Sequence, residues 1–160
     1  MPDIHMRPTV VIGLGNTLMS DEGIGVHLVR ALVVRANQFP AVDFRELGTA
    51  GMAVLHTLAG RRKAVLLDCV RMNEPPGAIR RFNPDQVASG KVLPGFSLHE
   101  GDLLEILALS RRLGEFPGTV ILFGIQPASL DVGDSLSPVL AARFEEYLRL
   151  IAAELDEYAS

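Results

Sequence analysis

Residues 9–32, TVVIGLGNTLMSDEGIGVHLVRAL, decide the fold class. The stretch opens with a short, β-rich apolar run at residues 9–16 that is stopped by glycines, which predicts a buried first strand. After the loop at residues 17–23, apolar side chains recur at helical spacing from Ile24 onward until Pro40 closes the segment. A buried strand that leads through a loop into a helix is the start of a βαβ unit.

The remainder of the chain continues this alternation. Further strands are predicted at residues 42–47, 63–70 and 119–125, and an added edge strand at residues 78–82. Ser137 is expected to cap the last helix, with Pro138 at its first position. The expected fold class is α/β: a single domain over residues 1–160, built as a three-layer α/β/α sandwich with a mostly parallel, five-stranded, twisted sheet and one antiparallel edge strand.

The composition excludes several classes of protein. With 160 residues, 48% hydrophobic and 21% charged, the chain has enough core for one domain without disulfides. A net charge of −4 with dispersed basic residues argues against a nucleic-acid partner. The single cysteine, Cys69, rules out an intramolecular disulfide, and the N-terminal residues show no secretion signal. No apolar run approaches the roughly 18 to 20 residues that span a bilayer. We therefore expect a cytoplasmic protein with no membrane and no nucleic-acid partner.

Three potential metal ligands follow the predicted strands or face them. Glu22 lies in the loop after the first strand, Asp68 near the end of the strand at 63–70, and His99 before a helix. In an open α/β sheet, sites assemble at the carboxyl ends of the strands, so these residues are expected to converge. Two carboxylates and one imidazole suit a borderline divalent ion with open coordination positions. Because the chain has no HExxH motif or His/Cys cluster, the set should bind metal weakly by itself, and the metal is expected to arrive with the substrate.

Each of these residues also has a structural interpretation. Glu22 would stabilise the N-terminus of the following helix, and its neighbour Asp21 would be the capping residue of that helix. Asp68 suits a turn at a strand end, and His99 suits a helix cap or the protein surface. Cys69 is expected to pack in the core. The combination of the three ligands, rather than any one of them, favours a functional site.

A dinucleotide site is a weaker interpretation of the end of the first strand. The third glycine of a GxGxxG motif would fall at Leu18, and Glu46 alone resembles a ribose-binding acid. Asp21 and Glu22 also place two negative charges where a phosphate group would sit. The acidic pair suits a cation instead, so metal is the better class of ligand.

Five motifs carry a resemblance to a known family: GLGNTLMSDEGIGV, GTAGM, LLDCV followed by a PG turn, SLHE and FGIQP. Their order and spacing, from Val10 to about Leu148, closely resemble the [NiFe]-hydrogenase maturation endopeptidases. Glu22, Asp68 and His99 stand on the positions that this family uses for its metal. The resemblance implies cleavage of a short C-terminal extension from the hydrogenase large-subunit precursor after nickel insertion.

The resemblance also implies a role for nickel. Glu22, Asp68 and His99 would coordinate the precursor's nickel transiently, so that the metal belongs to the substrate. Polarisation of the scissile carbonyl, activation of water by the metal and general-base catalysis by a carboxylate all stay open, as does a role in recognition alone.

The second motif departs from the family pattern. Members commonly carry Asp-Gly before the Gly-Thr, whereas this chain has Glu46 and Leu47. Glu46 would preserve the charge with a longer reach, and the change concerns which hydrogenase is processed. The resemblance implies a substrate groove lined by Glu46, Gly48, Thr49, Ala50 and Gly51. A strand-to-helix turn without substrate contact is the alternative.

Two other functions stay open. VIGLGN also looks like the opening of peptidyl-tRNA hydrolases, although the acidic balance and the presence of Asp21 and Glu22, where that family needs an Asn and His pairing, count against an RNA-contacting esterase. A nickel-dependent maturation chaperone that binds the precursor without cutting it is equally compatible with the three ligands, because no nucleophile is evident. The protease interpretation requires only a monomer that docks transiently on the precursor.

Overall fold

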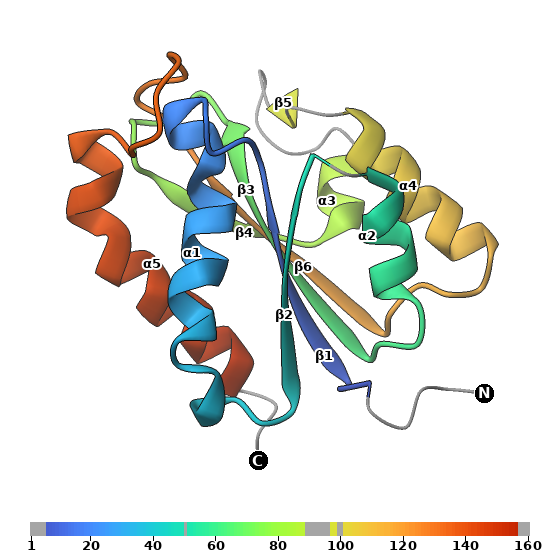
Figure 1. Cartoon of the computed structure of the whole chain (residues 1–160). Coiled ribbons are helices and arrows are strands. Elements are labelled where there is room, and N and C mark those ends of the chain that lie inside the picture. Colours follow the sequence, from blue (N-terminus) through green and yellow to red (C-terminus); the bar gives the residue numbers. More distant parts are fainter. Residues whose placement is uncertain (1–5, 50, 89–96, 99–100, 157–160) are drawn as a thin grey trace.

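The first strand, β1 (Thr9–Leu14), lies inside the predicted sheet. The computed structural model describes residues 6–49, 51–88, 97–98 and 101–156. The strand order is β2-β1-β3-β6-β4, with β2 at Val42–Gly48, β3 at Lys63–Arg71, β4 at Ile79–Phe82 and β6 at Thr119–Ile125. Four of these strands run parallel, and β4 pairs antiparallel with β6 at one side of the sheet. The predicted five-stranded, mostly parallel sheet is confirmed (Figure 1).

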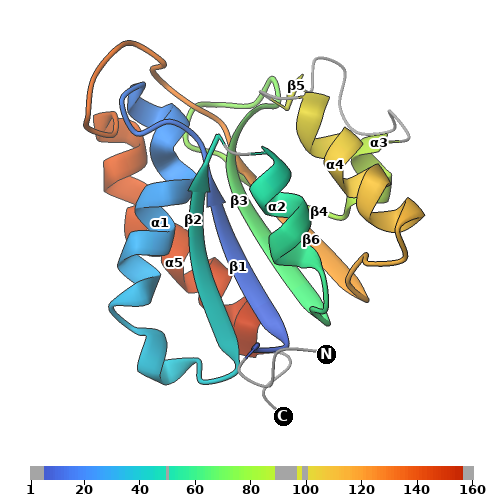
Figure 2. The same cartoon turned by 45° about the vertical axis from the view of Figure 1, so that its right-hand side comes forward.

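Helices cover both faces of this sheet, which confirms the expected three layers (Figures 1 and 2). One face carries α1 (Ile24–Val33) and α5 (Pro138–Asp156), and the other carries α2 (Gly51–Leu58), α3 (Pro84–Ala88) and α4 (Gly101–Arg112). Along β3, Val65 and Leu67 pack into the core under α1 and α5, whereas Ala64 and Leu66 pack into the core under α2 and α4. The uniformly apolar run of β3 is therefore buried on both sides. Within the described residues, no helix is both long and apolar enough to cross a membrane.

The structure adds short elements that the sequence did not predict. A two-residue strand, β5 (Ser97–Leu98), pairs antiparallel with Arg71 and Val70 at the end of β3. This pairing is possible because the ladder between β1 and β3 stops at Leu67, so β3 extends beyond it. Two 3₁₀ turns, η1 (Ser20–Gly23) and η2 (Ala36–Gln38), flank α1. Elements this short are too brief to show a hydrophobic period.

The boundaries of the longer elements follow local chemistry. The first strand ends at Leu14 instead of residue 16 because Gly15 has a φ of +116°, which only glycine adopts readily. The last helix begins as predicted: Pro138 is its first residue, and the N–H of Leu140 donates to Ser137 Oγ at 3.3 Å.

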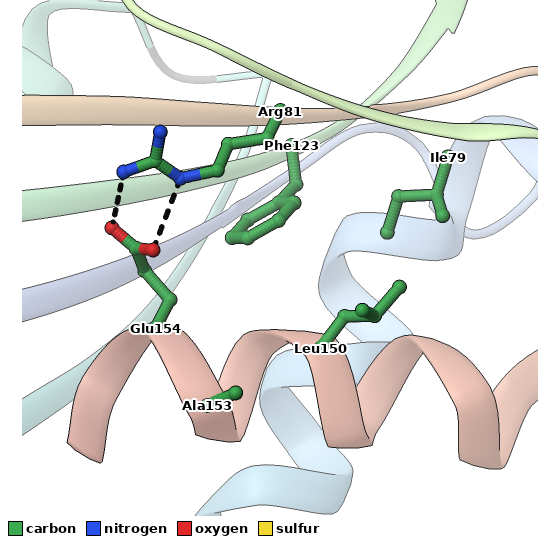
Figure 3. Close-up of a pocket in the computed structure, with 6 residues that line it drawn as sticks. All are labelled: Ile79, Arg81, Phe123, Leu150, Ala153 and Glu154. Carbon is green, nitrogen blue, oxygen red and sulfur yellow. Dashed lines mark hydrogen bonds and ion pairs between the residues drawn. The ribbon is translucent and has the colours of Figure 1, made fainter. Parts of the chain in front are cut away.

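A buried ion network fixes α5 at the edge of the sheet where β3 begins, which we call the amino edge. Lys63 Nζ lies 3.0 Å from Glu154 Oε1, and the Arg81 guanidinium donates to both oxygens of the same carboxylate at 2.9 and 3.0 Å. Burial alone would raise the pKa of Glu154, but Arg81 and Lys63 outweigh it and hold the pKa below its usual value. A cavity of about 560 Å³ lies beside the network, and Ile79, Phe123 and Leu150 line its apolar part (Figure 3). The acid at this edge is thus balanced by two cations.

Candidate functional site

The opposite edge, where β1, β2, β3 and β6 end, is the carboxyl edge, and two glycines bring its parts together. A Cβ on Gly15 would lie 1.9 Å from the carbonyl oxygen of Glu22, and a Cβ on Gly25 would lie 2.1 Å from the carbonyl oxygen of Leu67. Neither approach leaves room for a side chain, because these are backbone atoms. The segment from Gly15 to Gly25 therefore lies directly on the ends of β1 and β3, next to Asp68.

Glu22 and Asp68 are both almost fully buried at this edge, each 7% exposed. Asp68 Oδ1 accepts a hydrogen bond from the Cys69 N–H at 2.8 Å. Burial raises the pKa of the Cys69 thiol, and the charges of Asp68, Glu22 and Asp21 raise it further. Because η1 contacts β3, the structure places Glu22 and Asp68 at the same edge of the sheet, from positions 46 residues apart in the sequence. Cys69 itself is buried in the core, as predicted.

The third predicted ligand, His99, lies outside the described residues. The residue before it, Leu98, pairs with Val70, which follows Asp68 by two positions. The chain therefore returns to the end of β3 immediately before His99 (Figure 1). Among the described residues, no group of three His, Cys, Asp or Glu side chains is arranged to hold a metal ion. The two carboxylates supply oxygen donors suited to a divalent cation but do not complete a resident site.

Asp21 has a structural role that differs from the predicted helix cap. Its side chain is fully buried, and the N-cap of α1 is Gly23, with no side-chain cap. Asp21 Oδ2 instead accepts the N–H groups of Ala128 and Ser129 at 2.9 Å each, and Oδ1 accepts the N–H of Ser137 at 2.7 Å. The carboxylate thus fixes the loop at residues 126–137 to the carboxyl edge. No local pattern marks this role, because the partners lie more than 100 residues away in the sequence.

Three of the five predicted substrate residues line a polar cavity of about 310 Å³ beside η1. Its walls come from the ends of β1 and β2 and from α1, and they include Glu46, Gly48 and Thr49. Gly51 lies at the start of α2 and donates its N–H to the carbonyl of Thr49 at 3.1 Å, while Ala50 lies outside the described residues. The structure therefore places three of the five residues on one cavity wall.

Arg30 also lines this cavity, and the sequence did not predict it. Its guanidinium donates to both oxygens of Glu46, at 2.9 and 2.8 Å. This hydrogen-bonded contact lowers the pKa of Glu46. Beside the pair, His27 has a pKa lowered first by burial and then by the charge of Arg30. The pairing depends on how α1 packs against β2, so no spacing in the sequence signals it.

Comparisons with known proteins agree on one family. The family model for the hydrogenase maturation protease matches residues 26–154, a range that contains Asp68 but begins after Glu22. The hydrogenase 2 maturation protease of Escherichia coli is 34% identical, with 92% of this chain and 90% of the relative covered. The hydrogenase expression/formation protein HoxM of Cupriavidus necator is 33% identical over 86% of this chain and 68% of the relative.

A solved structure shows the same arrangement of elements. The hydrogenase maturating endopeptidase HybD from Escherichia coli superimposes with a TM-score of 0.81 at 32% identity, with 95% of this chain and 93% of that chain covered. The fold, the family model and the relatives thus point to the same activity, that of a peptidase. This chain belongs to the hydrogenase maturation protease family.

Proposed function

We propose that this protein removes the C-terminal extension of a [NiFe]-hydrogenase large-subunit precursor after nickel insertion, and that the bound nickel is the signal it recognises. The observation that carries the proposal is that η1, which holds Glu22, contacts β3, which holds Asp68, at the carboxyl edge, with both carboxylates nearly buried. Carboxylates in that position keep a cation from the substrate within reach while leaving coordination positions for the substrate's own ligands.

In this proposal Glu22, Asp68 and His99 contact the nickel only while the precursor is bound. Nickel is then part of the substrate, and its presence tells the enzyme that the precursor is ready for cleavage. With the metal held, a carboxylate is placed to accept a proton from the attacking water, or the metal polarises the scissile carbonyl. Both routes use the same residues and predict the same loss on substitution.

The polar cavity beside η1 is the proposed groove for the peptide next to the cleavage site. Glu46, Gly48 and Thr49 line it together with Arg30, and Gly15, which also lines it, packs against the backbone of Glu22. Thr49→Arg should block processing by filling the cavity while the melting temperature stays close to that of the wild type. Normal processing by Thr49→Arg would remove the cavity from the substrate path.

The experiment that tests the activity follows the mass of a nickel-loaded precursor incubated with this protein. Loss of a C-terminal peptide is expected with the wild type and should be abolished by Glu22→Gln, Asp68→Asn and His99→Ala. The matched control is Glu145→Gln on α5, because that glutamate is 73% exposed and remote from the carboxyl edge. Complex formation without any mass change, using a precursor that its own protease cleaves, would favour the non-cleaving chaperone and contradict the proposal.

We also propose that the protein works in the cytoplasm as a monomer that docks transiently. A free, buried cysteine is compatible with a reducing compartment. Native mass spectrometry of the protein with and without precursor should show a single copy of this chain in each species. A stable dimer of the free protein would contradict this part of the proposal.

A further inference from the structure

The loop at residues 126–137 is joined to the segment before Glu22 by strand-like pairing. Met19 and Gly133 form an isolated parallel bridge. Around it, the Gly133 N–H donates to the Leu18 carbonyl and the Ser20 N–H donates to the Gly133 carbonyl, both at 2.9 Å. Ser20 itself has a φ of +50°, a left-handed conformation that is unusual for a residue other than glycine. The two segments lie side by side at the carboxyl edge, where the orange loop meets the blue segment in Figure 1.

Further polar contacts from Ser20 and Asp21 hold the loop at residues 126–137 in place. The Asp21 carboxylate accepts three of its N–H groups, the Asp21 N–H donates to the Ser129 carbonyl at 3.1 Å, and Ser20 Oγ donates to the Asp131 carbonyl at 2.6 Å. Ser20 and Asp21 are both buried, at 8% and 0% exposure. Backbone that is ordered in this way loses conformational entropy, and the contacts must offset that loss. The loop is therefore held by these polar contacts as well as by Leu130 and Leu136, which pack against the core under α1 and α5.

The pairing exposes two apolar side chains, beside the exposed Asp131 and Asp134. Leu18 is 65% exposed and Val132 is 85% exposed, and each is the residue immediately before one partner of the bridge. A single exposed apolar residue is ordinary, but two on segments that are hydrogen-bonded to each other form a preorganised contact. Preorganisation lowers the entropy that binding would otherwise cost.

This pair, which we call the docking rim, is continuous with the candidate site. Thr17, the residue before Leu18, lines the polar cavity, and Glu22 follows on the same segment. Leu18 therefore lies on the segment between the cavity and Glu22. A folded substrate that carries an inserted metal offers more surface than a free peptide, so contacts outside the cavity are expected for it.

We infer that Leu18 and Val132 dock the folded body of the large-subunit precursor next to its cleavage site, through an apolar patch on the precursor. This inference rests on the proposed function for the identity of the partner. The docking rim would raise the affinity for the whole precursor without taking part in bond cleavage.

A matched pair of variants tests the rim by kinetics. Val34 is 84% exposed, almost the same as Val132, and lies at the far end of α1, about 15 Å along the helix from the carboxyl edge. Val132→Asp should raise KM for the nickel-loaded precursor at least about tenfold, or about 1.4 kcal/mol. Its kcat and melting temperature should stay close to those of the wild type, and Val34→Asp should change neither KM nor kcat. Equal KM values for Val132→Asp and Val34→Asp would overturn the inference.

A binding measurement separates this inference from the proposed function. Val132→Cys and Val34→Cys, each in a Glu22→Gln background, are labelled with an environment-sensitive fluorophore; the natural Cys69 is only 3% exposed. Adding precursor should shift the emission to the blue at position 132 and leave it unchanged at position 34. A complex that forms without a shift at 132 overturns the docking rim alone. If the wild type docks on the precursor through the rim but never cleaves it, the inference stands and the proposed function fails.

Discussion

Both edges of the sheet bury acids, but the charged groups that lie near these acids differ. At the amino edge Glu154 faces Lys63 and Arg81, so its charge is balanced and its pKa is lowered. At the carboxyl edge Glu22 and Asp68 are equally buried, and together with Asp21 they act as a group of negative charges on the Cys69 thiol. A buried acid paired with a base stabilises a fold, whereas we propose that Glu22 and Asp68 contact a cation that the substrate carries.

The largest expected effect is a loss of activity on substitution of the acids at the carboxyl edge. Glu22→Gln and Asp68→Asn should each lower kcat/KM by at least about a hundredfold, the scale seen when metal-site groups are altered. Both substitutions keep the shape of the side chain, so the melting temperature should move little. Cleavage assays and thermal melts on the same samples check this. A variant that cleaves normally but has a lower melting temperature would show that Glu22 or Asp68 stabilises the fold and does not take part in cleavage.

The complementary change at the amino edge should affect stability alone. Glu154→Gln leaves Lys63 buried without a full counter-charge, and removing one partner of such a pair costs about 3 kcal/mol. The exposed side of Arg81 limits its share of this loss, because solvent screens it. Urea denaturation measures the loss, and kcat below the melting range should equal that of the wild type. A fall in kcat comparable to that of Glu22→Gln would show that Glu154 contributes to activity as well as to stability.

The same acid predicts a pH dependence with a definite sign. Because the pKa of Glu154 is lowered in the folded state, its pairing stabilises the protein at neutral pH, and this contribution is lost as pH falls below its ordinary value of 4.5. The difference in unfolding free energy between wild type and Glu154→Gln should therefore shrink as pH falls through this range. A difference that grows with acidification would contradict the assigned ion network.

Asp21 should have an intermediate effect, because it is an acid of the carboxyl edge with a structural task. In Asp21→Asn one acceptor oxygen becomes an N–H₂ group that faces a backbone donor, and losing a hydrogen bond to a charged group costs about 2 kcal/mol. Hydrogen exchange at the amides of Ala128, Ser129 and Ser137 should accelerate before exchange in β3 does. Unchanged protection of these three amides would show that the loop does not depend on Asp21.

The smallest effect is expected at the Arg30–Glu46 pair, whose side chains are 53% and 45% exposed. Solvent-exposed pairs contribute little to stability, so Arg30→Met should leave the melting temperature unchanged. If the cavity holds substrate, KM should rise a few-fold, and the double variant Arg30→Glu/Glu46→Arg should recover more than either single reversal. Equal losses in all three variants would mean that the pair does not act as a unit.

The sequence predicted the parts of this molecule that depend on long, regular patterns. The apolar run of β3 and the amphipathic α5 with its Ser137 cap are where they were expected, because burial on both faces and helix capping leave local signals. The position of η1 and Asp68 at one edge was also predictable, since parallel strands end at the same edge of the sheet.

What the sequence could not supply are contacts that only packing creates. Asp21 looked like the cap of its own helix, but its carboxylate binds the loop at residues 126–137. Arg30 reaches Glu46 because α1 lies against β2, and β5 exists because β3 extends past β1. In each case the deciding partner is remote in sequence or too short to show a pattern.

The central claim is that a cation carried by the substrate completes the carboxyl edge. The most direct test compares the rate of peptide release from one precursor prepared with and without nickel, using wild-type protein under identical conditions. We expect release from the nickel-loaded precursor and none from the nickel-free one, with Glu22→Gln inactive on both. Equal release from the two preparations by the wild type would show that Glu22 and Asp68 do not recognise nickel, and would contradict the proposed function.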